Sequence, residues 1–256
     1  MNKELEVLND WFKANKLSLN ASKTNYVLFT KDRISKECAH NLTIDDTVLA
    51  KKISVNFLVI HIDKKLEWQE HIEFCRKKLA SGVYALNSTK RILSQVNLKM
   101  LYYSIIHPYL LYGNILWGSA YKIHLNKLVI LQKKAVRCIT NAKYNEHTPP
   151  IFKELMIPNV LDLYMIQLGK FVYSQLNNQL PAGLINIFVP NKEIHGYHTR
   201  NCDGAHMKPV KVDIVHRSFI HQGPALWSNI PDMIKASRTV ECFGSRLKKY
   251  FIAKLA

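Results

Sequence analysis

The sequence predicts an α+β protein in which a small set of antiparallel strands precedes a long, mostly α-helical body. Within the first 65 of its 256 residues, short runs rich in valine, isoleucine and threonine alternate with turn residues, as in hairpins. From residue 66 onward, apolar residues recur every three or four positions, which is the spacing of amphipathic helices. Hydrophobic residues make up 48% of the chain, which is enough to build buried cores in both parts.

The head begins with a predicted helix over 3–16, in which Leu5, Leu8, Trp11 and Phe12 recur at helical spacing. Short extended segments follow this helix, separated by the turn-forming run "NASK". The strand-forming stretch 41–63 then completes the head.

Two adjacent aspartates, Asp45 and Asp46, interrupt the strand-forming stretch. They mark a tight hairpin turn between "LTI" and "TVL". Neighbouring aspartates also hold the two metal ions of polymerases, but here no second strand supplies another carboxylate. We therefore interpret the pair as turn residues.

The body consists of several helices with recognisable boundaries. Asn97 is a candidate N-cap for the helix that follows it, and Pro108 should end that helix near Ile106. The segment 124–141 has the cleanest amphipathic pattern, with apolar residues on one side and basic residues mainly on the other. The tail over 216–255 predicts two or three short helices.

Positive charge is the dominant property of the composition. Lysine and arginine number 36 against 19 acidic residues, a formal net charge of +17. Such an excess indicates a polyanionic partner, with nucleic acid favoured over a membrane surface. The sequence has no apolar run of membrane-spanning length and no secretory signal, and its five scattered cysteines form no CxxC pair. We expect an intracellular protein, nuclear or cytoplasmic, that is neither secreted nor inserted in a membrane.

The basic residues gather on predicted helical faces, where they are either solvated or in contact with phosphates. Several helices share the excess, so we favour phosphate contact. The candidate phosphate-binding residues are Arg76, Lys77, Lys78, Lys90, Arg91, Lys133, Lys134 and Arg137.

Other chemistries receive less support. His195, His198, Cys202 and His206 have spacings that could bind zinc, but they lie in a loop-like segment without paired cysteines, so we favour no metal site. The sequence also has no nucleophile elbow and no glycine-rich phosphate loop.

The order of several motifs resembles the reverse transcriptases of non-LTR retrotransposons, in particular jockey-like and CR1-like elements. "WFKANKLSLNASKT" with "VLF" is similar to the fourth palm motif of these enzymes, and "FLVIHIDKKLEWQEHI" to the fifth, the primer-grip hairpin. Five further segments are similar to the region beyond the thumb in these elements: 103–118, 127–139, 147–155, 219–231 and 243–251.

The resemblance implies three regions: a partial palm over 1–65, a thumb-like helical region over 66–145 and a C-terminal helical extension over 146–256. The parent enzymes are RNA-directed DNA polymerases that use magnesium and act on an RNA template and a DNA primer. Because the chain starts after the position of their catalytic aspartate pair, we expect it to need no cofactor, to be inactive alone and to keep binding template–primer, such as an RNA–DNA hybrid. The alternative is a non-enzymatic nucleic-acid-binding or interaction protein derived from such an element.

The resemblance also assigns roles to single residues. Lys23 matches the lysine that protonates the leaving pyrophosphate, and Phe57, Leu58, Val59 and Ile60 match the primer grip. The family usually has glycine where this chain has Val59, so we expect an altered hairpin, since valine resists the backbone torsions that glycine allows.

Overall fold

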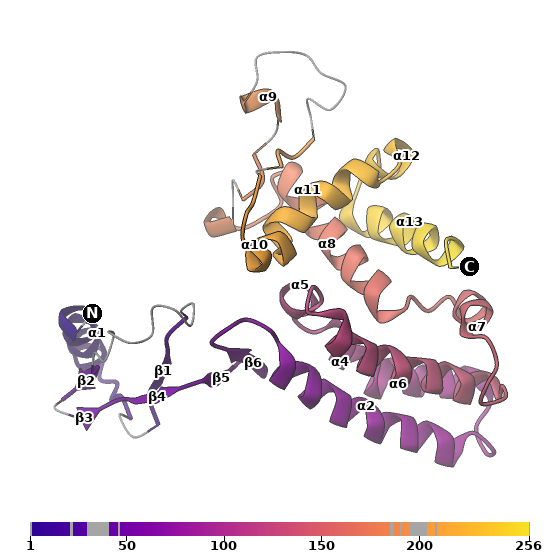
Figure 1. Cartoon of the computed structure of the whole chain (residues 1–256), viewed down its shortest axis with the longest axis horizontal. Helices are drawn as coiled ribbons and strands as arrows, with labels where there is room; N and C mark the ends of the chain where they lie inside the picture. The colour runs from indigo at the N-terminus through magenta and orange to yellow at the C-terminus, as the bar shows by residue number, and fades with distance from the viewer. Residues whose placement is uncertain are drawn as a thin grey trace. The chain divides into compact units, whose positions relative to one another are not determined.

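Figure 1 shows the computed structural model, in which the chain divides into two compact units, Met1–His71 and Ile72–Ala256. The first unit contains the strands and the second is helical in its described part, which confirms the predicted α+β class. The structure describes residues 2–20, 23–29, 41–45, 47–184, 187–189, 191–194, 204–207 and 209–255, except for the side chains of residues 192 and 193.

The head unit is built from one helix and three pairs of short strands. Its elements are α1 (Asn2–Ala14), β1 (Asn25–Val27), β2 (Thr43–Ile44), β3 (Thr47–Val48), β4 (Ala50–Lys52), β5 (Ser54–Phe57) and β6 (Ile60–Asp63). The pairs β2–β3 and β5–β6 are antiparallel, as expected for hairpins. The pair β1–β4 is parallel, with Asn25 opposite Ala50, so the antiparallel prediction is wrong for this pair. The long connection from β1 to β4 gives the chain room to return in the same direction.

The turn of the first hairpin is closed by Asp45, which has a left-handed φ of 44°. Its carboxylate accepts hydrogen bonds from Asn9 Nδ2 and Lys13 Nζ, each at 2.8 Å. This confirms the turn interpretation for Asp45 and fastens α1 to the hairpin; Asp46 lies outside the described residues. Leu5 packs on the small apolar cluster next to these bonds.

The second hairpin, β5–β6, has a two-residue turn formed by Leu58 and Val59. Because Phe57 pairs with Ile60, both turn residues must take left-handed backbone angles, and their φ values are 48° and 68°. A β-branched residue is strained at such an angle, whereas glycine is not. The hairpin therefore forms with valine in place of glycine, at a conformational cost located at Val59.

The second unit is an assembly of helices. In chain order these are α2 (Gln69–Thr89, whose first residues lie in the head), α3 (Gln95–Ile105), α4 (His107–Leu111), α5 (Asn114–Trp117), α6 (Lys122–Thr140), α7 (Thr148–Leu155), α8 (Val160–Leu176), the 3₁₀ turn η2 (Ala182–Leu184), α9 (Asn191–Ile194), α10 (Asp213–Arg217), α11 (Phe219–Asn229), α12 (Asp232–Lys235) and α13 (Val240–Ala253).

Helix α8 is the packing centre of this unit. It lies against α13 and α11 and also touches α4, α5 and α6 (Figure 1). Gly169 lets α13 approach closely, since a Cβ there would lie 2.6 Å from Leu247 Cδ2. The buried rings of Tyr173 and Phe243 stack with centroids 4.7 Å apart in the same core.

Two helix boundaries compare informatively with the sequence prediction. Ser94, rather than Asn97, caps α3, because its side chain accepts a hydrogen bond from the Asn97 backbone N–H. The Asn97 prediction is therefore wrong by three residues. Helix α3 ends at Ile105, and Pro108 lies in the first turn of α4, which confirms the predicted break.

Helix α6 buries one polar side chain among its apolar ones. Gln132 is 1% exposed; its Nε2 donates to Tyr102 Oη (2.9 Å) and to the Pro158 carbonyl (3.0 Å), and its Oε1 accepts from the Val160 N–H (2.8 Å). One residue thus joins α6 to α3 and to the start of α8. Every buried polar group in this contact is paired, as stability requires.

Candidate nucleic-acid interface

The residues matched to polymerase motifs lie on the surface of the head unit. Lys23 is an exposed turn residue whose backbone N–H bonds to Asn20. Phe57, Leu58 and Val59 are exposed at the tip of the β5–β6 hairpin, whereas Ile60, which pairs with Phe57, is buried. The exposed apolar tip fits a contact with a partner; the roles of these residues stay predictions.

Asp63 organises the chain between this hairpin and α2. Its Oδ1 accepts from the Lys65 and Glu67 backbone N–H groups, and its Oδ2 accepts from that of Trp68 at 2.7 Å. These bonds satisfy backbone donors just before the helix begins. The "IDKKLEW" part of the fifth motif is therefore a turn that leads into α2.

Five of the predicted phosphate-binding residues lie away from the groove described next, four of them on helices and Arg91 in the turn after α2. Arg76 binds Glu73, one turn earlier, with a shortest distance of 2.6 Å, so its charge is largely compensated within α2. Lys77, Lys78, Arg91 and Lys133 are exposed. None of these five lines the groove described next.

Lys90, Lys134 and Arg137 converge on a groove of about 450 Å³ between α2 and α6. Figure 1 shows these two helices alongside each other in the second unit. Ala80, Val83, Leu131 and other small or apolar side chains form much of its lining. No acidic side chain is among the described residues that line it. The groove is therefore a concave surface with an apolar lining and uncompensated positive charge.

The two helices run in the same direction along the groove. Near their N-termini, Lys127 of α6 lies close enough to Glu73 of α2 to affect its ionisation. Near their C-termini, the Cys138 thiol lies 3.9 Å from Asn87 Oδ1. Successive turns of α2 therefore lie beside successive turns of α6 along the groove.

The turn after α6 is fixed to the helix by Arg137. Its Nε and Nη2 donate to the Glu146 carbonyl at 2.9 and 2.7 Å, and Asn141 ends α6 with a left-handed φ of 52°. The Glu146 side chain accepts from the Lys143 N–H. These bonds hold the turn that places Tyr144 at the groove. Because the Glu146 carbonyl is neutral, it does not neutralise the positive charge of Arg137.

The three cations of the groove, with no acidic side chain among its described lining residues, favour an anionic ligand. Outside the groove, near the N-terminal ends of α2 and α6, hydrogen bonds from Arg76 lower the pKa of Glu73, and Lys127 and Lys77 lower it further. Burial raises the pKa of the Cys138 thiol more than nearby Lys90 lowers it. This shift favours the protonated thiol over the nucleophilic thiolate.

Sequence reasoning missed the two tyrosines of the groove. Tyr84 of α2 and Tyr144 of the turn after α6 are 75% and 81% exposed, respectively, although both line the groove. The available signal was an aromatic residue beside the core positions of a helix, and another in a polar turn. Tyr102 and Trp117, by contrast, are fully buried.

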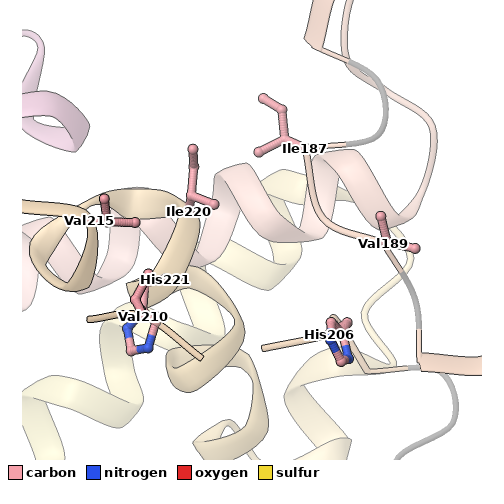
Figure 2. A pocket seen from close by; sticks show the side chains of 7 residues that line it. All are labelled: Ile187, Val189, His206, Val210, Val215, Ile220 and His221. Carbon is pink, nitrogen blue, oxygen red and sulfur yellow. The ribbon is translucent and has the colours of Figure 1, made fainter. Parts of the chain in front are cut away.

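A second cavity, of about 130 Å³, lies between the segment around Ile187 and helices α10 and α11. Figure 2 shows its lining, which is aliphatic apart from His206 and His221. No lysine or arginine is among the described residues that line it, so this cavity is a much poorer binding site for a polyanion than the groove.

Metal binding finds no support in the described part of the chain. His195, His198 and Cys202 lie outside the described residues, and His206 Nδ1 lies 3.2 Å from Asn191 Oδ1. The described residues contain no group of three or more histidine, cysteine or acidic side chains that could hold an ion. Nor is any described helix long and apolar enough to cross a bilayer.

Comparison with known proteins relates the chain to polymerases of mobile elements. It is 29% identical over 195 residues to the RNA-directed DNA polymerase from mobile element jockey of Drosophila melanogaster, and 27% identical over 161 residues to that of Drosophila funebris. It is 26% identical over 157 residues to a Drosophila melanogaster protein described as "Probable RNA-directed DNA polymerase from transposon X-element".

These matches cover 71%, 62% and 60% of this chain, respectively, but only 21%, 17% and 17% of the relatives. The chain thus spans about a fifth of their length. No family model and no solved structure matches it. The chain is related to reverse transcriptases of non-LTR retrotransposons, as the order of its motifs predicted.

Proposed function

We propose that this chain is the C-terminal, template–primer-binding part of an RNA-directed DNA polymerase of a non-LTR retrotransposon. The observation that carries the proposal is the α2–α6 groove, where three cations predicted to contact phosphates meet and the described lining residues include no carboxylate. Its relatives are named as polymerases that copy RNA, so an RNA–DNA hybrid is the expected ligand. The hairpin tip at 57–59 would add an apolar contact to the primer end.

Among the residues that the structure describes, no set of carboxylates fits the two magnesium ions of the parent enzymes. Asp45, the best carboxylate candidate, is bonded to Asn9 and Lys13, and the described residues offer no cluster of ligands. We therefore propose that the chain alone holds a duplex and does not extend it. A primer-extension assay with purified chain, hybrid and magnesium should give no product; clear polymerisation would overturn this part of the proposal.

Salt dependence tests the binding itself. Each phosphate contact contributes about −0.9 to the slope of log affinity against log salt. Measured by fluorescence anisotropy on a blunt RNA–DNA hybrid, Lys90→Ala and Lys134→Ala should each reduce the steepness of the slope by about 1.

Lys249→Ala is the matched control, because Lys249 is an exposed lysine of α13 that does not line the groove. Arg76→Ala should also have a small effect, since Glu73 already compensates that charge. An affinity that barely changes with salt, or equal effects of all four substitutions, would refute the groove as the binding surface.

A non-enzymatic nucleic-acid-binding role is the second candidate. It is favoured by the fact that all the residues lining the groove belong to the second unit, so this surface needs nothing from the head. The two functions differ in their response to a primer end. A polymerase-derived grip should bind a hybrid with a recessed primer 3′ end more tightly than one with an equally long overhang beside a recessed 5′ end, whereas a general binding protein should not distinguish them.

A further inference from the structure

We propose that the α2–α6 groove receives unpaired nucleotides adjoining the duplex, whose bases stack on Tyr84 and Tyr144. This inference rests on the proposed nucleic-acid binding and specifies what the groove itself contains. The two tyrosines lie on separate elements that line one groove, and both rings are mostly exposed. Rings exposed to this extent contribute little to the core of the unit and are accessible to a ligand.

The size of the groove indicates a strand rather than a double helix. Its volume of about 450 Å³ falls in the range of sites that enclose small molecules, roughly 300–1,000 Å³. This is the scale of a nucleotide, whereas a duplex meets proteins over a much larger surface. The phosphates of a duplex can meet the groove's cations from outside, whereas only an unpaired strand is narrow enough to place its bases inside the groove.

The chemistry of the lining matches single-stranded nucleic acid. Proteins that bind single strands combine cations that follow the phosphates with aromatic rings on which bases stack. Here Lys90, Lys134 and Arg137 supply the cations and the two tyrosines supply the rings. An acidic peptide would use the cations but would leave both rings without a stacking partner, so a nucleotide explains more of the surface.

The backbone positions that carry the two rings are fixed before any ligand arrives. Tyr84 belongs to the C-terminal part of the 21-residue helix α2. Tyr144 lies in the turn that Arg137 and Glu146 fasten to α6. Such preorganisation reduces the ordering cost of binding.

The test compares two substrates with the full chain. One is a blunt RNA–DNA hybrid, and the other is the same hybrid with a short unpaired extension that carries 2-aminopurine, made in separate RNA and DNA versions. The extended hybrid should bind more tightly, and its 2-aminopurine fluorescence should be quenched by stacking. The RNA and DNA versions together show which strand the groove accepts.

Tyr84→Ala and Tyr144→Ala should each weaken binding of the extended hybrid roughly ten-fold, with the blunt hybrid unchanged. Tyr84→Phe keeps the ring and should restore most of the affinity. Unfolding curves matching those of the unchanged chain would establish that the variants fold.

Equal affinity for both substrates, or alanine variants that bind the extension normally, would overturn the inference while leaving salt-dependent duplex binding intact. Oligoglutamate that displaces the extension as well as an oligonucleotide of equal charge would overturn it in favour of an acidic peptide. Loss of salt dependence on the blunt hybrid would instead refute the proposed function.

Discussion

The buried Gln132 side chain offers the sharpest test of the helical unit. Replacing it with alanine removes three hydrogen bonds and leaves the Tyr102 hydroxyl, the Pro158 carbonyl and the Val160 N–H without partners in the core. A buried polar group that loses its partner costs about 1–3 kcal/mol. Because the cavity could admit water that satisfies part of this demand, we expect a total loss of about 4 kcal/mol in unfolding free energy.

Urea denaturation followed by tryptophan fluorescence measures this loss, since Trp117 is fully buried in the same unit. Lys133→Ala is the matched control: it truncates the adjacent, exposed residue of α6 and should change stability by less than about 0.5 kcal/mol. Gln132→Glu should be as harmful as alanine at neutral pH, because a carboxylate cannot donate to the Pro158 carbonyl. A loss below about 1 kcal/mol for Gln132→Ala would show that these bonds do not stabilise the native core.

Three further predictions concern single positions. Val59→Gly should relieve the left-handed turn of the β5–β6 hairpin and stabilise it by about 1 kcal/mol, so amide hydrogen exchange across the hairpin should slow; faster exchange would argue against strain at this site. Burial lowers the pKa of His71 from 6.5 to about 4, so the unfolded chain binds the extra proton in this window. The stability of the head should therefore be complete above pH 6.5 and fall as the pH drops towards 4; His71→Gln should abolish this slope in denaturation curves at several pH values, and an unchanged slope would assign it to another group. Gly118→Ala would place a Cβ 2.5 Å from Tyr164 Cδ2 and should lower the thermal midpoint by several degrees. Gly183→Ala, whose Cβ would meet no atom within 4 Å, is its control, and equal shifts in the two variants would refute the packing argument.

Features that depend on neighbouring residues alone were predictable from the sequence. The apolar periodicity of α6 and the break at Pro108 are confirmed, because both follow from local geometry. The cap of α3 was placed at the wrong residue since Ser94 and Asn97 are both good capping residues and the sequence does not rank them.

Features that depend on distant partners were not predictable. Trp11, one of the regularly spaced apolar residues of α1, is 56% exposed in the head unit, whereas the polar Asn9 is buried. The reason is the hydrogen bond from Asn9 to Asp45, 36 residues away, which no local pattern reveals. The parallel pairing of β1 with β4 depends in the same way on the path of the intervening chain.

The candidate interface illustrates the same division between local and distant information. The composition shows an excess of positive charge, but charge alone makes Arg76 and Lys134 equally good candidates for phosphate contact. The structure separates them, because Arg76 is paired with Glu73 on its own helix whereas Lys134 faces a groove whose described lining holds no carboxylate. Which cations face an uncompensated groove is set by the packing of α2 beside α6. A search for nucleic-acid contacts in this chain should therefore begin with the cations that share a groove with exposed aromatic rings, not with the densest run of basic residues in the sequence.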